Sequence, residues 1–116
     1  MDIKLVIMQS KLLLKQNPTI KDIQEYVLEL EKERKFDQQG IIEKSLLLGE
    51  EIGELFKAIR KKEALGIDKN KSKVANVEEE LADILIYVCS IANRYNIDLE
   101  KAFREKEKQN KLRSWS

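Results

Sequence analysis

Only four glycines and one proline occur among the 116 residues, and this scarcity of chain-breaking residues restricts the fold most strongly. A fold of many short strands needs frequent turns, and most turns depend on glycine, proline or small polar residues. Long stretches without glycine or proline favour helices instead. The length is typical of one domain with a modest core. We therefore expect a single all-α domain.

Apolar residues recur at helical spacing along most of the chain. The spacing predicts helices over residues 1–16, 20–35, 41–62 and 77–95, and a last helix that starts at Leu99. Asn17 and Pro18 break the first helix, and Thr19 with Asp22 resembles a capping box at the start of the second. The polar, lysine-rich residues 65–76 read as a loop. We predict a four- to five-helix bundle over residues 18–116, preceded by a helical extension over residues 1–17.

Charge and composition exclude several classes of function. Lysine and arginine total 22 against 21 acidic residues, so the chain lacks the positive excess that nonspecific nucleic-acid binding requires. The longest apolar run, Ile84–Cys89, is too short to span a bilayer, and we expect no membrane partner. Without histidine there is no imidazole base or ligand. The single cysteine, Cys89, favours a reducing compartment such as the cytoplasm.

Two of the predicted helices have extensive apolar surface, and one of them has more than a small monomer needs. The helix over residues 77–95 is apolar nearly all the way round, which is typical of burial in a core or a subunit contact. We therefore expect a homo-oligomer, with part of the segment 84–91 at or near the contact. In the helix over residues 41–62, one broad face is expected to be core; it comprises Ile41, Ser45, Leu48, Ile52, Leu55, Phe56 and Ile59.

Acidic residues flank these apolar faces in two pairs, each with three-residue spacing. Glu51 and Glu54 share one helix, and Glu80 and Asp83 share the other. Side chains at this spacing are neighbours on a helix surface, and carboxylates beside apolar surface need a counter-charge. Four carboxylates on two packed helices suit Mg²⁺, or Mn²⁺, as hard oxygen ligands. Structural salt bridges to lysine or arginine are the alternative.

The last predicted helix changes character along one stripe. Leu99, Ala102 and Phe103 mark an apolar stripe, and the same spacing continues to Lys106, Asn110 and Arg113. Cations in such a row could neutralise phosphate groups, and arginine can bind them bidentately. A solvated terminus explains the same residues equally well.

Taken in order, these motifs resemble those of the MazG-like nucleoside triphosphate pyrophosphohydrolases. The stretch 48–55 is similar to the family's E-E-x-x-E signature, residues 79–85 to its E-x-x-D motif, and Lys106, Asn110 and Arg113 to its K-x-x-x-N-x-x-R/K pattern. The similarity extends over residues 19–115. It implies an all-α fold and Mg²⁺-dependent hydrolysis of a (deoxy)nucleoside triphosphate to the monophosphate and pyrophosphate. It also implies a dimer or a dimer of dimers.

The resemblance also assigns roles to individual residues. It makes Glu51, Glu54, Glu80 and Asp83 the metal ligands, and Lys106, Asn110 and Arg113 substrate-binding residues. Because the chain has no histidine, a carboxylate is the obvious general base, and Glu50 and Glu51 are the candidates. Two other functions stay open: a non-enzymatic helical interaction module with salt-bridged acids, and a phosphoribosyl-nucleotide pyrophosphohydrolase of the same fold.

Overall fold

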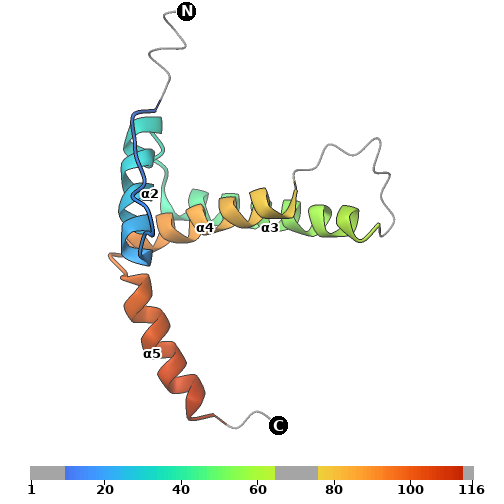
Figure 1. Cartoon of the computed structure of the whole chain (residues 1–116). Coiled ribbons are helices and arrows are strands. Elements are labelled where there is room, and N and C mark those ends of the chain that lie inside the picture. Colours follow the sequence, from blue (N-terminus) through green and yellow to red (C-terminus); the bar gives the residue numbers. More distant parts are fainter. Residues whose placement is uncertain (1–9, 65–75, 114–116) are drawn as a thin grey trace, which may run out of the picture. The chain divides into compact units, whose positions relative to one another are not determined.

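The computed structural model describes residues 10–64 and 76–113 of the chain (Figure 1). Within these ranges it contains helices and no strand, which confirms the all-α prediction; the helices are α2 (Ile20–Arg34), α3 (Ile41–Lys62), α4 (Val77–Arg94) and α5 (Leu99–Lys111). All four begin at the predicted residues, and α2, α3 and α4 end within one residue of the prediction. In the described part of the chain, no helix is both long and apolar enough to cross a membrane.

The N-terminal helix is the exception among the predicted elements. Residues 10–16 are not helical, so this part of the prediction is wrong, and residues 1–9 lie outside the described residues. The reason is a lack of packing: Leu13 is 92% exposed, and a short helix without a packed face is marginal in water. Polar contacts hold the segment instead. Lys15 pairs with Asp22 across 3.3 Å, and the Ser10 hydroxyl accepts a hydrogen bond from the Leu12 amide.

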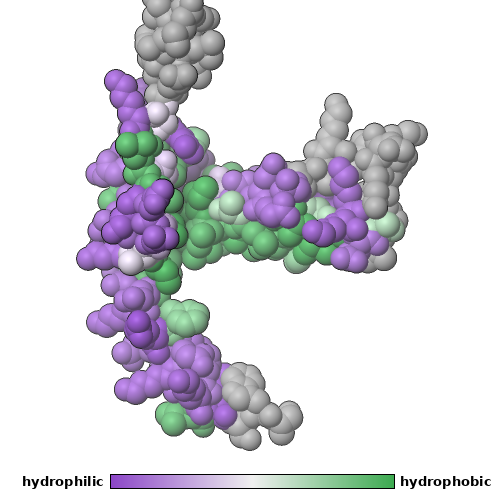
Figure 2. Space-filling view, viewed as in Figure 1, coloured by the Kyte–Doolittle hydropathy of each residue, from purple (hydrophilic) through white to green (hydrophobic). Residues whose placement is uncertain are grey.

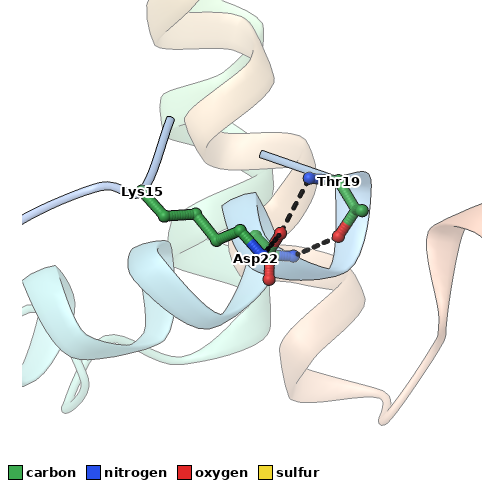
Figure 3. Close-up of polar contacts among 3 residues, drawn as sticks. All are labelled: Lys15, Thr19 and Asp22. Atoms are coloured by element: carbon green, nitrogen blue, oxygen red, sulfur yellow. Dashed lines mark hydrogen bonds and ion pairs between the residues drawn. The ribbon is translucent and has the colours of Figure 1, made fainter. Parts of the chain in front are cut away.

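The start of α2 confirms the predicted capping box (Figure 3). The Asp22 amide donates to the Thr19 hydroxyl at 3.1 Å, and the Thr19 amide donates to the Asp22 carboxylate at 2.8 Å. These contacts, led by the bond from the Thr19 amide and helped by Lys15, lower the pKa of Asp22. At its other end α2 stops at Lys35, whose left-handed backbone (φ 62°) is typical of helix C-termini.

The described chain divides into two compact units. One contains α2 and α5, where the Leu99 amide donates to the Gln24 side-chain oxygen at 2.9 Å and the Asp98 side chain caps α5. The other contains α3 and α4, which pack side by side and run in opposite directions (Figure 1). The two helices that carry the acidic pairs therefore belong to one unit.

The apolar face predicted as core on α3 is largely exposed in the single chain. Ile52 is 36% exposed, Ile59 40% and Phe56 60%, so the prediction that this face is core is wrong for one copy of the chain. The buried apolar residues are instead few and small or medium-sized: Val27, Leu30, Ala58, Cys89 and Ala92. Among the described residues of its unit, α4 is the helix that covers α3, and Figure 2 shows apolar surface along the helix pair.

One stripe of α3 combines large exposed apolar residues with two glycines. Its members recur alternately every four and three residues, which is the spacing of a coiled-coil seam; they are Ile42, Leu46, Gly49, Gly53 and Phe56. Ile42 is 76% exposed and Leu46 69%. A Cβ atom added at Gly49 or Gly53 would have no neighbour within 4 Å. The stripe thus has the pattern and the free space that a further helix needs.

Candidate metal centre

Three of the four predicted metal ligands converge in the α3–α4 unit. One carboxylate oxygen each from Glu51, Glu80 and Asp83 lies within 4.8 Å of the other two. Glu51 comes from α3, and Glu80 and Asp83 come from α4. The packing of the two antiparallel helices therefore brings together residues that are 29 to 32 positions apart in the sequence.

The start of α4 determines how its two acids are presented. Asn76 caps the helix by accepting a hydrogen bond from the Glu79 amide at 2.8 Å. From this fixed start, the three-residue spacing puts Glu80 and Asp83 on one side of the helix. Glu80 is only 5% exposed, whereas Asp83 is exposed. The cluster therefore extends from the buried side of α4 to its surface, as a site that opens to substrate requires.

The electrostatics of the cluster favour the binding of a cation. Burial raises the pKa of Glu51 to about 7, with further contributions from its hydrogen bond to Glu80 and from the charges of Asp83, Glu80 and Glu54. The Oε2 atom of Glu80 is buried and has no hydrogen-bond partner. A divalent cation relieves both conditions, because it neutralises the acids and coordinates the enclosed oxygen. The residues present therefore fit a hard metal ion.

The raised pKa of Glu51 predicts that metal affinity depends on pH. A cation must displace the Glu51 proton, so affinity rises with pH up to about 7 and then levels off. Between pH 6 and pH 8 we expect Mn²⁺ to bind about 10-fold more tightly, as one titrating group with this pKa requires. Electron paramagnetic resonance of free Mn²⁺ measures this change. Equal affinity at the two pH values would contradict the prediction.

The same group links the stability of the metal-free chain to pH. Because folding raises the pKa of Glu51 above 4.5, its contribution to stability is present below pH 4.5 and is lost as the pH rises through about 7. Calorimetry without metal should show a Tm that falls over this range. Glu51→Gln should remove this part of the fall, and a variant whose pH dependence matches the parent chain would contradict the assignment.

The remaining acids of the signature, Glu50 and Glu54, lie outside the three-carboxylate cluster. Glu54 is outside the three-carboxylate group and pairs with Lys57, whose Nζ atom is 3.4 Å from Glu54 Oε1. The Glu54 charge still contributes to the raised pKa of Glu51. Glu50 is exposed on α3. Lys57 is not among the residues that the sequence motifs indicate. Its position three residues after Glu54 on a helix predicts the ion pair between them.

The predicted substrate-binding residues lie in the other unit, along α5 and just beyond it. Lys106 is exposed and Asn110 is half-buried. Arg113 lies past the end of α5 at Lys111, and its amide donates to the Asn110 carbonyl at 3.1 Å. The stripe also begins less buried than expected, since Phe103 is 69% exposed. The prediction of one helical stripe is therefore wrong for Arg113, which lies beyond α5, and the stripe is not buried at Phe103 in the single chain.

Comparison with known proteins decides the family. The family model described as "MazG nucleotide pyrophosphohydrolase domain" matches residues 39–114, well over half of the chain. The chain belongs to the MazG family. A search of the curated proteins gives no match. The general class that the sequence motifs imply, a nucleotide pyrophosphohydrolase family, is thereby confirmed.

The MazG match covers the part of the chain that carries the sequence motifs. It spans every residue that the sequence motifs singled out, from Glu50 to Arg113. It starts just before α3, so α2 and its capping box precede the matched region. The similarity noted from sequence starts earlier, at Thr19, and the domain boundary after residue 17 stays a prediction.

Proposed function

We propose that this MazG-family protein hydrolyses a ribo- or deoxyribonucleoside triphosphate to the monophosphate and pyrophosphate in a Mg²⁺-dependent reaction. Its role would be to clear or control part of the nucleotide pool. The observation that carries the proposal is the convergence of Glu51, Glu80 and Asp83 within 4.8 Å in a chain of a nucleotide pyrophosphohydrolase family. The free, buried thiol of Cys89 suits the cytoplasm, which we propose as the location.

Four carboxylates would hold the cation in this proposal. Glu51, Glu80 and Asp83 supply the converged oxygens, and Glu54, one turn after Glu51 on α3, supplies the fourth. Oxygen ligands of this kind suit Mg²⁺, and Mn²⁺ can take its place. When bound, the cation would offset the phosphate charge and lower the pKa of a coordinated water.

The hydrolytic step needs one proton acceptor from the chain. A water oxygen bonds to the α-phosphorus, the bond from that phosphorus to the bridging oxygen breaks, and pyrophosphate leaves with the electron pair. Glu50 or Glu51 accepts the proton of the attacking water. We assign phosphate contacts to Lys106, Asn110 and Arg113. The charges of Lys106 and Arg113 stabilise the leaving group.

Phosphorus NMR tests the reaction directly. The chain is incubated with Mg²⁺ and each common nucleoside triphosphate in water enriched in ¹⁸O. We expect a monophosphate that carries the label, together with unlabelled pyrophosphate. Label in the pyrophosphate, or release of single phosphates, would contradict attack at the α-phosphorus. A phosphoribosyl-nucleotide included in the panel tests the alternative substrate, and an interaction module would turn over none of them.

Substitutions on α5 test the assigned phosphate contacts. Loss of one charge-assisted contact is worth roughly 1.5–3 kcal/mol, so Lys106→Ala or Arg113→Ala should lower kcat/KM about 10- to 150-fold. Mg²⁺ affinity without nucleotide should stay unchanged. Arg104→Ala and Lys111→Ala are the controls, because Arg104 only makes an exposed pair with Glu100 at 3.7 Å. Equal small effects in all four variants would favour a solvated terminus.

We further propose that the protein acts as a homo-oligomer, a dimer or a dimer of dimers. The support is the exposed apolar stripe of α3, together with Leu81 and Leu85 of α4, which are 51% and 46% exposed. Monomeric proteins rarely expose such contiguous apolar surface. A second copy would bury it by helix packing of the kind that the stripe's spacing favours.

A further inference from the structure

We propose that Lys57 binds a phosphate oxygen of the pyrophosphate group, and that it exchanges Glu54 for this ligand when substrate enters. This inference rests on the proposed function. It adds a substrate-binding residue on α3, in the same unit as the acidic cluster, to those assigned on α5.

An ion pair with Glu54 places Lys57 beside the acidic cluster. Its ammonium group lies 3.4 Å from Glu54 Oε1, and Glu54 is close enough to Glu51 to raise the pKa of that residue. The Lys57 side chain is 55% exposed, so the ammonium can be reached from solvent while it contacts Glu54. A ligand held by the cluster would therefore meet Lys57 without any rearrangement of the helix.

The distribution of charge along α3 gives the direction of the phosphate chain. After Glu54, four cations occupy the last turns of α3: Lys57, Arg60, Lys61 and Lys62. On the other side of Glu51 lie the acidic Glu50, Gly49 and the half-buried Leu47 and Leu48, and the first cation in that direction is Lys44. A triphosphate bound at the cluster is attracted toward the positive end, so its β- and γ-phosphates extend toward the C-terminus of α3.

Two other cations among the described residues of the α3–α4 unit are poorly placed for this role. Lys44 is 1% exposed, so a ligand in solvent does not reach it. Arg94 follows Asp83 by 11 residues on α4, which is roughly 16 Å along a helix with a rise of 1.5 Å per residue. Lys57 follows Glu54 by less than one turn. Among the described residues of the unit, Lys57 is thus the cation nearest to Glu54 along the chain, and we expect the phosphate chain to meet it first.

The pair between Lys57 and Glu54 is weak enough to be exchanged. Both side chains are exposed, at 55% and 42%, and they are three residues apart on one helix. Such pairs favour the contact by only about a factor of two. A phosphate oxygen with more negative charge competes readily for the same ammonium, and Glu54 gains a cation as its new partner. The exchange therefore keeps both charges compensated before and after substrate enters.

Binding measurements on Lys57→Gln test the proposal without turnover. With Mg²⁺ present, titration calorimetry with inorganic pyrophosphate should give a Kd about 10-fold weaker than that of the parent chain, as loss of one charge-assisted contact implies. Binding of Mn²⁺ alone should stay equal or become up to about 2-fold tighter, because Glu54 loses its competing partner. Lys57→Arg should largely restore pyrophosphate binding.

A matched control is available on α2. Lys32 pairs with Glu29 at the same three-residue spacing and the same 3.4 Å, with side chains 56% and 54% exposed. Lys32→Gln removes an equal charge and an equal pair far from the acids in sequence, and should leave both affinities unchanged. Circular dichroism verifies the helical content of each variant.

Two results would overturn the proposal. Pyrophosphate affinity equal in Lys57→Gln and Lys32→Gln would show that Lys57 makes no contact, and a parallel loss of Mn²⁺ affinity would show that Lys57 only positions Glu54. Failure of the proposed function would give a different result. The parent chain itself would then bind neither Mn²⁺ nor pyrophosphate, whatever residue occupies position 57.

Discussion

Asp83→Asn and Glu80→Gln should each lower kcat/KM on the order of 10³-fold, a loss typical when electrostatic stabilisation of a transition state is removed. Both residues supply oxygens to the three-carboxylate cluster, and neither amide can replace an anionic ligand. Mn²⁺ affinity should fall in the same variants, whereas the helical signal in circular dichroism should not. Steady-state kinetics and Mn²⁺ titration measure the two effects.

The same substitutions should stabilise the metal-free chain. Glu80 is buried beside Glu51 and Asp83, and removing one of several neighbouring acids relieves their repulsion. A gain of about 1 kcal/mol corresponds to a Tm rise of roughly 4–8 °C in a domain of 60–100 residues, and to somewhat less in a longer chain. Glu78→Gln, an exposed acid in the first turn of α4, is the control. Near-normal activity in Asp83→Asn would refute the metal assignment.

Phe56→Glu should abolish assembly without unfolding the single chain. Phe56 is 60% exposed in one copy, so a charged side chain there meets water and costs little. In the proposed oligomer the same charge would be buried without a partner, which is strongly unfavourable. Light scattering at micromolar concentration should report a dimer or tetramer for the parent chain and a monomer for the variant.

The control for this prediction is another exposed apolar residue. Leu28 of α2 is 41% exposed and lies outside the α3 stripe, so Leu28→Glu should leave the assembly intact. Notably, a monomeric parent chain at micromolar concentration would refute the oligomer outright. An oligomer that survives Phe56→Glu would move the contact away from the stripe.

Local sequence rules account for most of the helices and for the pairing of the acids. The Thr19–Asp22 box determines where α2 starts, and the three-residue spacing of Glu80 and Asp83 follows from the period of a helix. These features depend on neighbours in sequence. The convergence of Glu51 with the α4 acids needed one further assumption, that the two long helices pack together, and the structure confirms that packing.

Features that depend on packing partners were less predictable. An apolar stripe indicates that a helix face packs against another element, but not whether that element belongs to the same chain. The exposure of Phe56 and Phe103 in one copy could therefore not be predicted. Leu5, Met8 and Leu12 have helical spacing in the sequence, yet only contacts to the rest of the chain could make residues 10–16 helical. The sequence did not predict a role for Lys57, because a lysine that follows a glutamate on a helix is common on solvated surfaces.

The placement of Glu51 on α3 and of Glu80 and Asp83 on α4 has a consequence for chain entropy. A cation held by both helices would close a loop of 29 residues, counted from 51 to 80, and act as a reversible cross-link. For a loop of that size the entropic model of cross-linking gives about 3–4 kcal/mol. The same model makes the closure cost only logarithmic in length, so a doubled loop costs roughly 0.6 kcal/mol more. The connection between α3 and α4 is therefore free to change in length and sequence while the carboxylates stay in place.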